Sequence, residues 1–117
     1  MATITRAILA KAVLKNLGII GIGVTPSAED SADVIDRIDS YHAQLRDDGM
    51  AYWSDDEIPL EVREPLTVLL AGVCAPMFQV STEKQTILAQ QIPNARKALG
   101  KHVQARRALR PNVAEFF

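Results

Sequence analysis

The chain has little of what disulfides, metal sites and membrane segments require. Its one cysteine, Cys74, cannot form an internal disulfide. Its two histidines, His42 and His102, lie far apart and outside any His-x-x-x-His pattern, so we expect neither a metal site nor a cofactor. No apolar run reaches the roughly 18 residues that cross a bilayer, and no charged segment precedes an apolar one after Met1. We therefore expect no membrane segment and no signal peptide.

The 117 residues suit one domain, which at this length buries roughly two thirds of the surface of the unfolded chain. Cys74 stands between apolar neighbours, where a free thiol is usually a small core residue rather than a nucleophile. A single reduced thiol also suits the cytoplasm. We therefore expect a protein that is not an enzyme and that folds around an apolar core.

The net charge of −1 hides a strong segregation of charge along the chain. Residues 1–20 carry +3, residues 21–80 carry −9 and residues 81–117 carry +5. Such polarity suits complementary contacts between copies of the chain or with a partner. Solvated helix faces show similar patterns, and for any single helix that is the simpler interpretation.

Apolar periodicity and capping residues predict helices over most of the chain. The first runs from Thr5 to Leu17 and ends at Gly18. Its apolar residues spread around most of its circumference, which predicts burial on more than one side, with another copy of the chain as one option for the second side. Thr25-Pro26 starts the second helix, with Pro at the first helical position, and Gly49 ends it.

The third helix begins near Pro59 or Pro65 and has no charge from Leu66 to Phe78. This stretch is predicted to be the central core helix. Pro76 lies near its end and is expected to kink or terminate it.

A fourth helix follows Ser81 or Thr82, and Pro93 inside it predicts a kink or a break. Its apolar face is formed by Ile87, Leu88, Ile92, Ala95, Leu99 and Val103. The fold class that results is all-α, a bundle-like domain of four helices.

Between the second and third helices, residues 50–60 form an acidic and aromatic loop, with a short hairpin as one option. We expect Trp53 to pack against its own domain and the acidic residues 55–57 to be exposed. The residues of this loop that a partner could contact are Tyr52, Trp53, Asp55, Asp56 and Glu57.

In order and spacing, three segments resemble the small head-to-tail adaptor (connector) proteins of tailed bacteriophages, above all the packaged-DNA stabilisation proteins of short-tailed phages. They are Ile8 to Gly18, Ala28 to Gly49 and Leu69 to Val80. The family's first helix ends at a Leu-Gly, as Leu17-Gly18 does here, and its third tends to end Leu-Ala-Pro-x-Phe-Gly-Val. This chain departs from that pattern at Gln79, where a glycine is common. Some relatives carry a much longer C-terminal extension, so activities lodged there are not expected here.

The resemblance implies a structural virion protein, made in the bacterial cytoplasm, at the junction of head and tail. It implies a ring, typically twelvefold, that docks under the portal, extends the DNA channel, helps to retain the packaged genome and attaches the tail. The partners would be the portal protein, a tail nozzle or tail-completion protein, further copies of the chain, and double-stranded DNA that passes without sequence-specific binding.

Within that picture, residues 1–105 form the helical adaptor domain and residues 106–117 a basic C-terminal docking arm. The loop residues named above would face the tail or the channel. The residues expected to dock on the portal are Arg106, Arg107, Arg110, Phe116 and Phe117, and those expected between subunits are Ile4, Ile8, Lys11 and Lys15.

Two other functions stay open at this level. Paired carboxylates among Asp55, Asp56 and Glu57 could hydrolyse a glycosidic bond in a tail-associated cell-wall enzyme, if one of them lay in an apolar pocket. The basic tail could belong to a small helical DNA-binding protein. Against the second function, the basic residues are not interleaved along one recognition helix.

Overall fold

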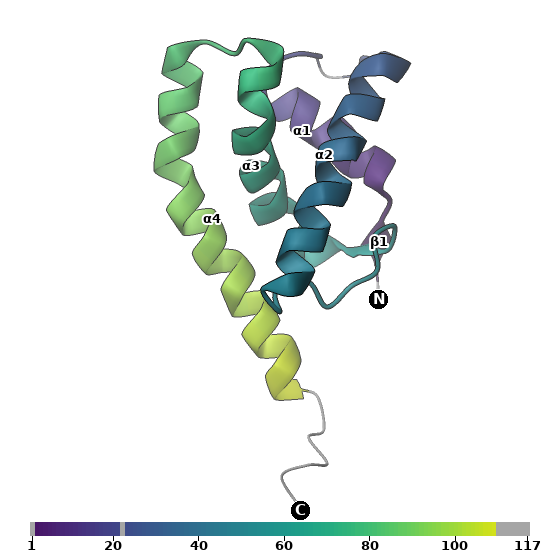
Figure 1. Cartoon of the computed structure of the whole chain (residues 1–117), viewed down its shortest axis with the longest axis vertical. Coiled ribbons are helices and arrows are strands. Elements are labelled where there is room, and N and C mark those ends of the chain that lie inside the picture. Colours follow the sequence, from purple (N-terminus) through teal and green to yellow (C-terminus); the bar gives the residue numbers. More distant parts are fainter. Residues whose placement is uncertain (1, 22, 110–117) are drawn as a thin grey trace, which may run out of the picture.

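The computed structural model describes residues 2–21 and 23–109. Most of them belong to four helices: α1 (Arg6–Asn16), α2 (Ala28–Asp47), α3 (Arg63–Cys74) and α4 (Thr82–Leu109). In Figure 1, α3 lies between α4 and α2, and α1 lies behind α2 and α3. The predicted all-α fold of four helices is confirmed. None of the helices in this part of the chain has the length and apolarity that crossing a bilayer requires.

The first helix begins and ends where its capping residues predict. The Thr5 hydroxyl accepts a hydrogen bond from the backbone N–H of Ile8 at 3.3 Å, and Gly18 takes a φ of +75° just after the helix. α1 packs against both α2 and α3. The predicted burial on two sides is therefore confirmed, but both sides belong to the same chain rather than to a second copy.

The second helix starts at Ala28, as the resemblance implies, and its cap is Ser27 rather than the Thr25-Pro26 pair that the capping pattern predicts. The Ser27 hydroxyl accepts from the backbone N–H of Asp30 at 3.1 Å. A serine followed by a run of helix-compatible residues caps as well as the Thr-Pro pair does, and here it lies closer to the apolar stripe. The stripe buries Val34, Ile38, His42 and Leu45, and Gly49 follows the helix with a φ of +74°.

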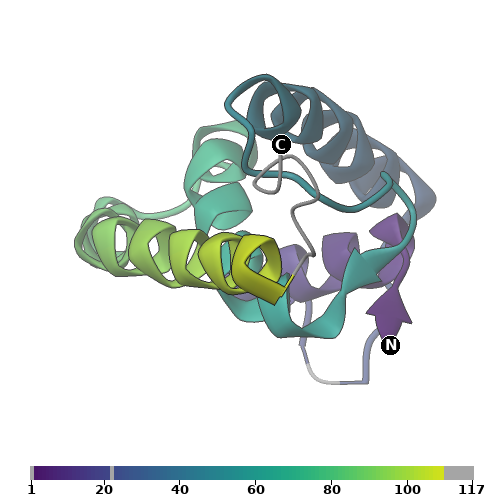
Figure 2. The ribbon, with the colours of Figure 1, turned by 90° about the horizontal axis from the view of Figure 1, so that it is seen from below.

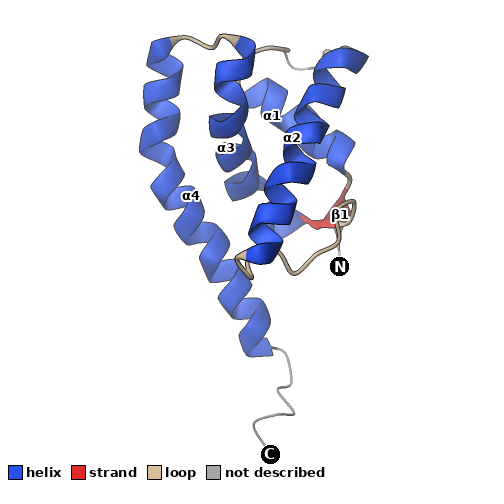
Figure 3. Cartoon of the chain, viewed as in Figure 1, coloured by secondary structure: helices blue, strands red, loops and turns tan. Residues whose placement is uncertain are grey.

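Residues 50–57 form a loop, as predicted, and the hairpin that was one option for residues 50–60 does not form. Instead β2 (Ile58–Pro59) pairs antiparallel with β1 (Thr3–Ile4), with Ile4 opposite Ile58 (Figure 3). Both isoleucines are buried, so the end of the loop gains more apolar contact from the N-terminal segment than from its own residues. The pairing ties the loop to the start of α1.

The third helix is the most buried of the four helices, as expected for the predicted core helix. A 3₁₀ turn (Leu60–Val62) leads into it, and a second one (Ala75–Phe78), with Pro76 at its start, follows it. Gln79 then takes a left-handed conformation with a φ of +53°. Glycine adopts this conformation without strain, so the backbone at position 79 favours glycine over the glutamine present.

The fourth helix is continuous from Thr82 to Leu109, so the predicted break at Pro93 is wrong. Pro93 has no backbone N–H to donate to the helix, but it is exposed, and the helix continues through it. Ser81 caps the helix, because its hydroxyl accepts from the backbone N–H of Lys84 at 3.2 Å. α4 approaches α3 closely at Gly72, where a Cβ atom would lie 2.7 Å from Cδ1 of Ile92.

Candidate functional site: the aromatic loop and the groove between α2 and α4

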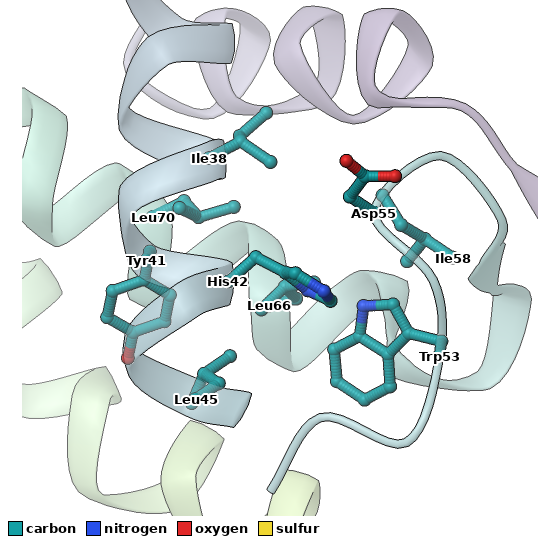
Figure 4. A pocket seen from close by; sticks show the side chains of 9 residues that line it. All are labelled: Ile38, Tyr41, His42, Leu45, Trp53, Asp55, Ile58, Leu66 and Leu70. Atoms are coloured by element: carbon teal, nitrogen blue, oxygen red, sulfur yellow. The ribbon is translucent and has the colours of Figure 1, made fainter. Parts of the chain in front are cut away.

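The loop between α2 and α3 is held to the body of the protein by its aromatic residues. Trp53 is only 6% exposed, and its indole lies beside the imidazole of His42 (Figure 4). The two ring centroids are 6.0 Å apart with an interplanar angle of 51°. The prediction that Trp53 packs against its own domain is therefore confirmed.

His42 is the one histidine of α2, and its charge state follows from its neighbour. A guanidinium nitrogen of Arg46 lies 3.3 Å from Nε2 of His42. Arginine can only donate, so Nε2 must accept and the imidazole must be neutral. Burial, followed by the positive charge of Arg46, lowers the pKa of His42 below its ordinary value.

A small cavity of about 10 Å³ lies at this contact, which is roughly the space that one water molecule needs. Side chains of α2, α3 and the loop surround it (Figure 4). Its lining residues are Ile38, Tyr41, His42, Leu45, Trp53, Asp55, Ile58, Leu66 and Leu70. The cavity is too small for a substrate and is lined mainly by carbon.

Tyr52 connects the loop to the end of α4. Its ring meets that of Trp53 edge-on, with centroids 5.1 Å apart, and its hydroxyl donates to a carboxylate oxygen of Glu61 at 2.8 Å. The guanidinium carbon of Arg106 lies 5.6 Å from the centre of the Tyr52 ring, within cation–π range. Burial and the Glu61 carboxylate raise the pKa of Tyr52 to about 12.

At the other end of the loop, Asp56 is tied to α1. One of its carboxylate oxygens accepts from the backbone N–H of Arg6 at 3.0 Å and from the side chain of Arg6 at 3.3 Å. The same guanidinium donates to Asp39 of α2 at 2.7 Å. The bonds from Arg6 lower the pKa of Asp56. Asp55 and Glu57 are exposed, as predicted for this acidic stretch.

The residues expected between subunits separate into two groups. Ile4 is 8% exposed and belongs to the core, so it is not available to another copy. Ile8 is 47% exposed, Lys15 is exposed and Lys11 is half-buried, which leaves one side of α1 open to a partner.

The expected docking arm begins inside a helix. Arg106 and Arg107 lie in α4, which runs through the expected boundary at residue 106. The Arg106 side chain contacts Tyr52, so it belongs in part to the body of the protein. Arg110, Phe116 and Phe117 lie outside the residues that the structure describes.

A groove of about 420 Å³ between α2 and α4 was not predicted. Leu45, Met50, Leu69 and Leu99 contribute apolar surface to it, and Arg96 and Lys97 lie on its α4 side. The other lining residues are Tyr41, Gln44, Asp48 and Pro93. The adjacent cations Arg96-Lys97 were visible in the sequence, but their position opposite α2 follows only from the packing of both helices on α3.

The helices on the two flanks carry opposite charge. Residues 28–47 of α2 hold six carboxylates and two arginines, whereas residues 82–109 of α4 hold six cations and one carboxylate. Figure 2 shows the two helices on different sides of the molecule. The segregation read along the sequence thus becomes a segregation between surfaces.

The described residues show no cluster of three or more His, Cys, Asp or Glu side chains that could hold a metal ion. Cys74 is buried, and burial raises the pKa of its thiol to about 11. A thiol with this pKa is almost wholly protonated at neutral pH and is a poor nucleophile.

No protein-family model, no curated protein and no solved structure matches this chain.

Proposed function

We propose that the protein is a structural head-to-tail adaptor of a tailed bacteriophage. Copies of it would form a ring below the portal, extend the DNA channel and offer a platform to the tail. The observation that carries the proposal is the opposite charge of α2 and α4 on two flanks of one small helical domain. The order of the helices and the Leu-Gly and Ala-Pro-x-Phe segments support it by resemblance.

A ring needs a heterologous interface, in which one face of each copy fits a different face of its neighbour. The acidic surface of α2, with Asp33 and Asp36 exposed, and the basic surface of α4, with Lys97 and Lys101 exposed, are suited to such a contact. Charge complementarity would set the register and direction of the ring rather than supply most of its affinity. Exposed apolar side chains on the same body, such as Ile87 at 42%, supply area to bury.

The far end of α4 is suited to docking. The helix extends past the other three in Figure 1, and it stays helical beyond Val103, which is buried, and Arg106, which contacts Tyr52. Its last described turns are basic, and the residues expected to dock follow them. Arginine and aromatic side chains are the usual energetic centres of interfaces.

The geometry favours neither alternative. A cell-wall hydrolase needs one carboxyl group with a raised pKa as its general acid. Asp56 instead has a lowered pKa, and its neighbours Asp55 and Glu57 are exposed. Duplex DNA would meet the acidic surface of α2 as well as the basic surface of α4, which weakens a phosphate-driven complex.

Cryo-electron microscopy of the protein mixed with the portal protein encoded in the same genome tests the proposal. We expect a ring on the portal, and native mass spectrometry of the protein alone should show monomers or weak oligomers. Portal particles that stay bare at micromolar adaptor would contradict the proposal. Detectable hydrolysis of peptidoglycan that is lost when residues 55–57 are made neutral would support the lytic alternative.

Charge reversal tests the contact between copies. Lys97→Glu together with Lys101→Glu should prevent ring formation without unfolding, because both side chains are exposed. Asp33→Lys with Asp36→Lys on α2 should do the same. The two variants mixed should form mixed rings if α2 of one copy meets α4 of the next, and failure of this rescue would place the interface elsewhere.

A further inference from the structure

A chain of four side chains crosses the protein from α2 to the end of α4. His42 contacts Trp53, Trp53 contacts Tyr52, and the Tyr52 ring lies under Arg106. Figure 4 shows the first of these contacts, with the side chain of Trp53 reaching from the loop toward His42 of α2. Residues 52 and 53, the two loop residues in this row of contacts, belong to no helix or strand.

The contact between His42 and Arg46 has only one workable protonation state. A neutral imidazole accepts the guanidinium N–H at Nε2. A protonated imidazole has no acceptor, and it would set a second cation 3.3 Å from the guanidinium of Arg46, which is exposed, while the His42 residue itself is only 9% exposed. An uncompensated buried charge of this kind is relieved by movement or by entry of water.

The other charged groups near His42 do not remove this conflict. Asp39 of α2 and Asp55 of the loop favour the protonated form, but burial and Arg46 outweigh them. Asp39 is in addition engaged by Arg6 at 2.7 Å. Tyr41 of α2 lines the same cavity, and α3 and β2 contribute Leu66, Leu70 and Ile58, which carry no charge.

We propose that His42 is a proton-sensitive latch, whose protonation releases Trp53 and the loop segment 50–55 from α2. The loop is the part that moves, because Trp53 lies beside the buried imidazole and is held there only by side-chain contacts, whereas His42 belongs to a regular helix. Release would stop at Asp56, which Arg6 holds, and at Ile58, which is paired with β1.

Release of Trp53 would also affect the contact between Tyr52 and Arg106 at the end of α4. Tyr52 is positioned by Trp53 and Glu61, and it covers one side of Arg106. When Trp53 leaves, Tyr52 loses its edge-on neighbour and Arg106 loses its aromatic surface. The end of α4, where the expected docking arm begins, would then be free of the loop. This inference does not depend on the adaptor function, because it concerns only contacts within one chain.

The protein carries its own probe, because Trp53 is its single tryptophan. The experiment follows tryptophan emission and acrylamide quenching of the full chain at micromolar concentration from pH 8 to pH 5, with far-ultraviolet circular dichroism in parallel. We expect a red shift and stronger quenching with a midpoint below 6.5, the ordinary pKa of histidine, while the helical signal is retained. His42→Gln should abolish the transition, and His102→Gln should leave it unchanged.

Nuclear magnetic resonance titration of the two imidazoles keeps the test decisive if His42→Gln does not fold. A His42 titration that coincides with the change in Trp53 emission supports the latch. His42 titration without any change at Trp53 would overturn it, as would a transition that persists in a folded His42→Gln variant. A transition that follows His102, or one that coincides with loss of the helical signal, would also overturn it.

Discussion

α3 and α4 lie side by side, yet they have opposite relations to solvent. α3 buries seven of its twelve residues, including Leu66, Leu69 and Leu70. α4 is more than twice as long, but from Thr82 to Arg106 its buried residues form a single stripe of Leu88, Ala95, Leu99 and Val103. The short helix is central to the fold, while most of the long helix faces outward with a basic surface. In a small helical domain, therefore, the length of a helix does not indicate how much of the fold depends on it.

The largest loss of stability is expected from a charge placed in the buried face of α3. Leu70 is 1% exposed, so Leu70→Asp buries an unpaired carboxylate at a cost of several kcal/mol, a large part of the roughly 5–15 kcal/mol that domains have. We expect loss of the helical circular dichroism signal at 25 °C. Val73→Asp, on the exposed side of the same helix at 38% exposure, is the matched control and should still fold. Equal melting temperatures for both variants would mean that α3 is not the core.

A cavity in the stripe of α4 should have a smaller effect. Leu99 is 1% exposed and lies between α3 and the groove, so Leu99→Ala should lower the free energy of unfolding by about 2–5 kcal/mol. Ile87→Ala, at 42% exposure on the same helix, should change it by less than about 0.5 kcal/mol. Urea denaturation followed by circular dichroism measures both. A difference below 1 kcal/mol would show that the stripe of α4 contributes less than its burial indicates.

Two truncations test where the contribution of α4 to stability ends and the expected docking arm begins. Removal of residues 110–117 should leave the melting temperature unchanged. Removal of residues 106–117 also removes Arg106 from Tyr52, and we expect a loss of about 0.5–1 kcal/mol from the cation–π contact. Both truncated proteins should fail to assemble on the portal. If a truncated protein unfolds, the arm belongs to the core. If a truncated protein still binds to the portal, the docking surface lies on α1 or on the loop.

The smallest effect is expected at the turn that joins the two helices. Gln79→Gly removes left-handed strain of about 1–2 kcal/mol but gives the unfolded chain more freedom, so the net gain in stability should be about 0.5 kcal/mol. Gly49→Ala provides the opposite case, since Gly49 has a φ of +74°, and it should destabilise. Thermal unfolding of the two variants should move in opposite directions. A lower melting temperature for Gln79→Gly would mean that the glutamine side chain stabilises the turn.

The amino-acid sequence by itself determined the number and kind of the helices, the ends at Gly18 and Gly49, and the role of α3 as core. These features depend on apolar periodicity, caps and glycine, which act over a few residues and can be read locally. The Thr25-Pro26 cap of α2 and the possible break of α4 at Pro93 were wrong, because competing caps differ by small energies and an exposed proline is tolerated within a helix. Only the tertiary structure decided the pairing of β1 with β2, the contacts of His42 with Trp53 and of Tyr52 with Arg106, and the groove between α2 and α4. Each of these joins residues far apart in the sequence, and no local pattern specifies which distant surface a buried side chain will meet.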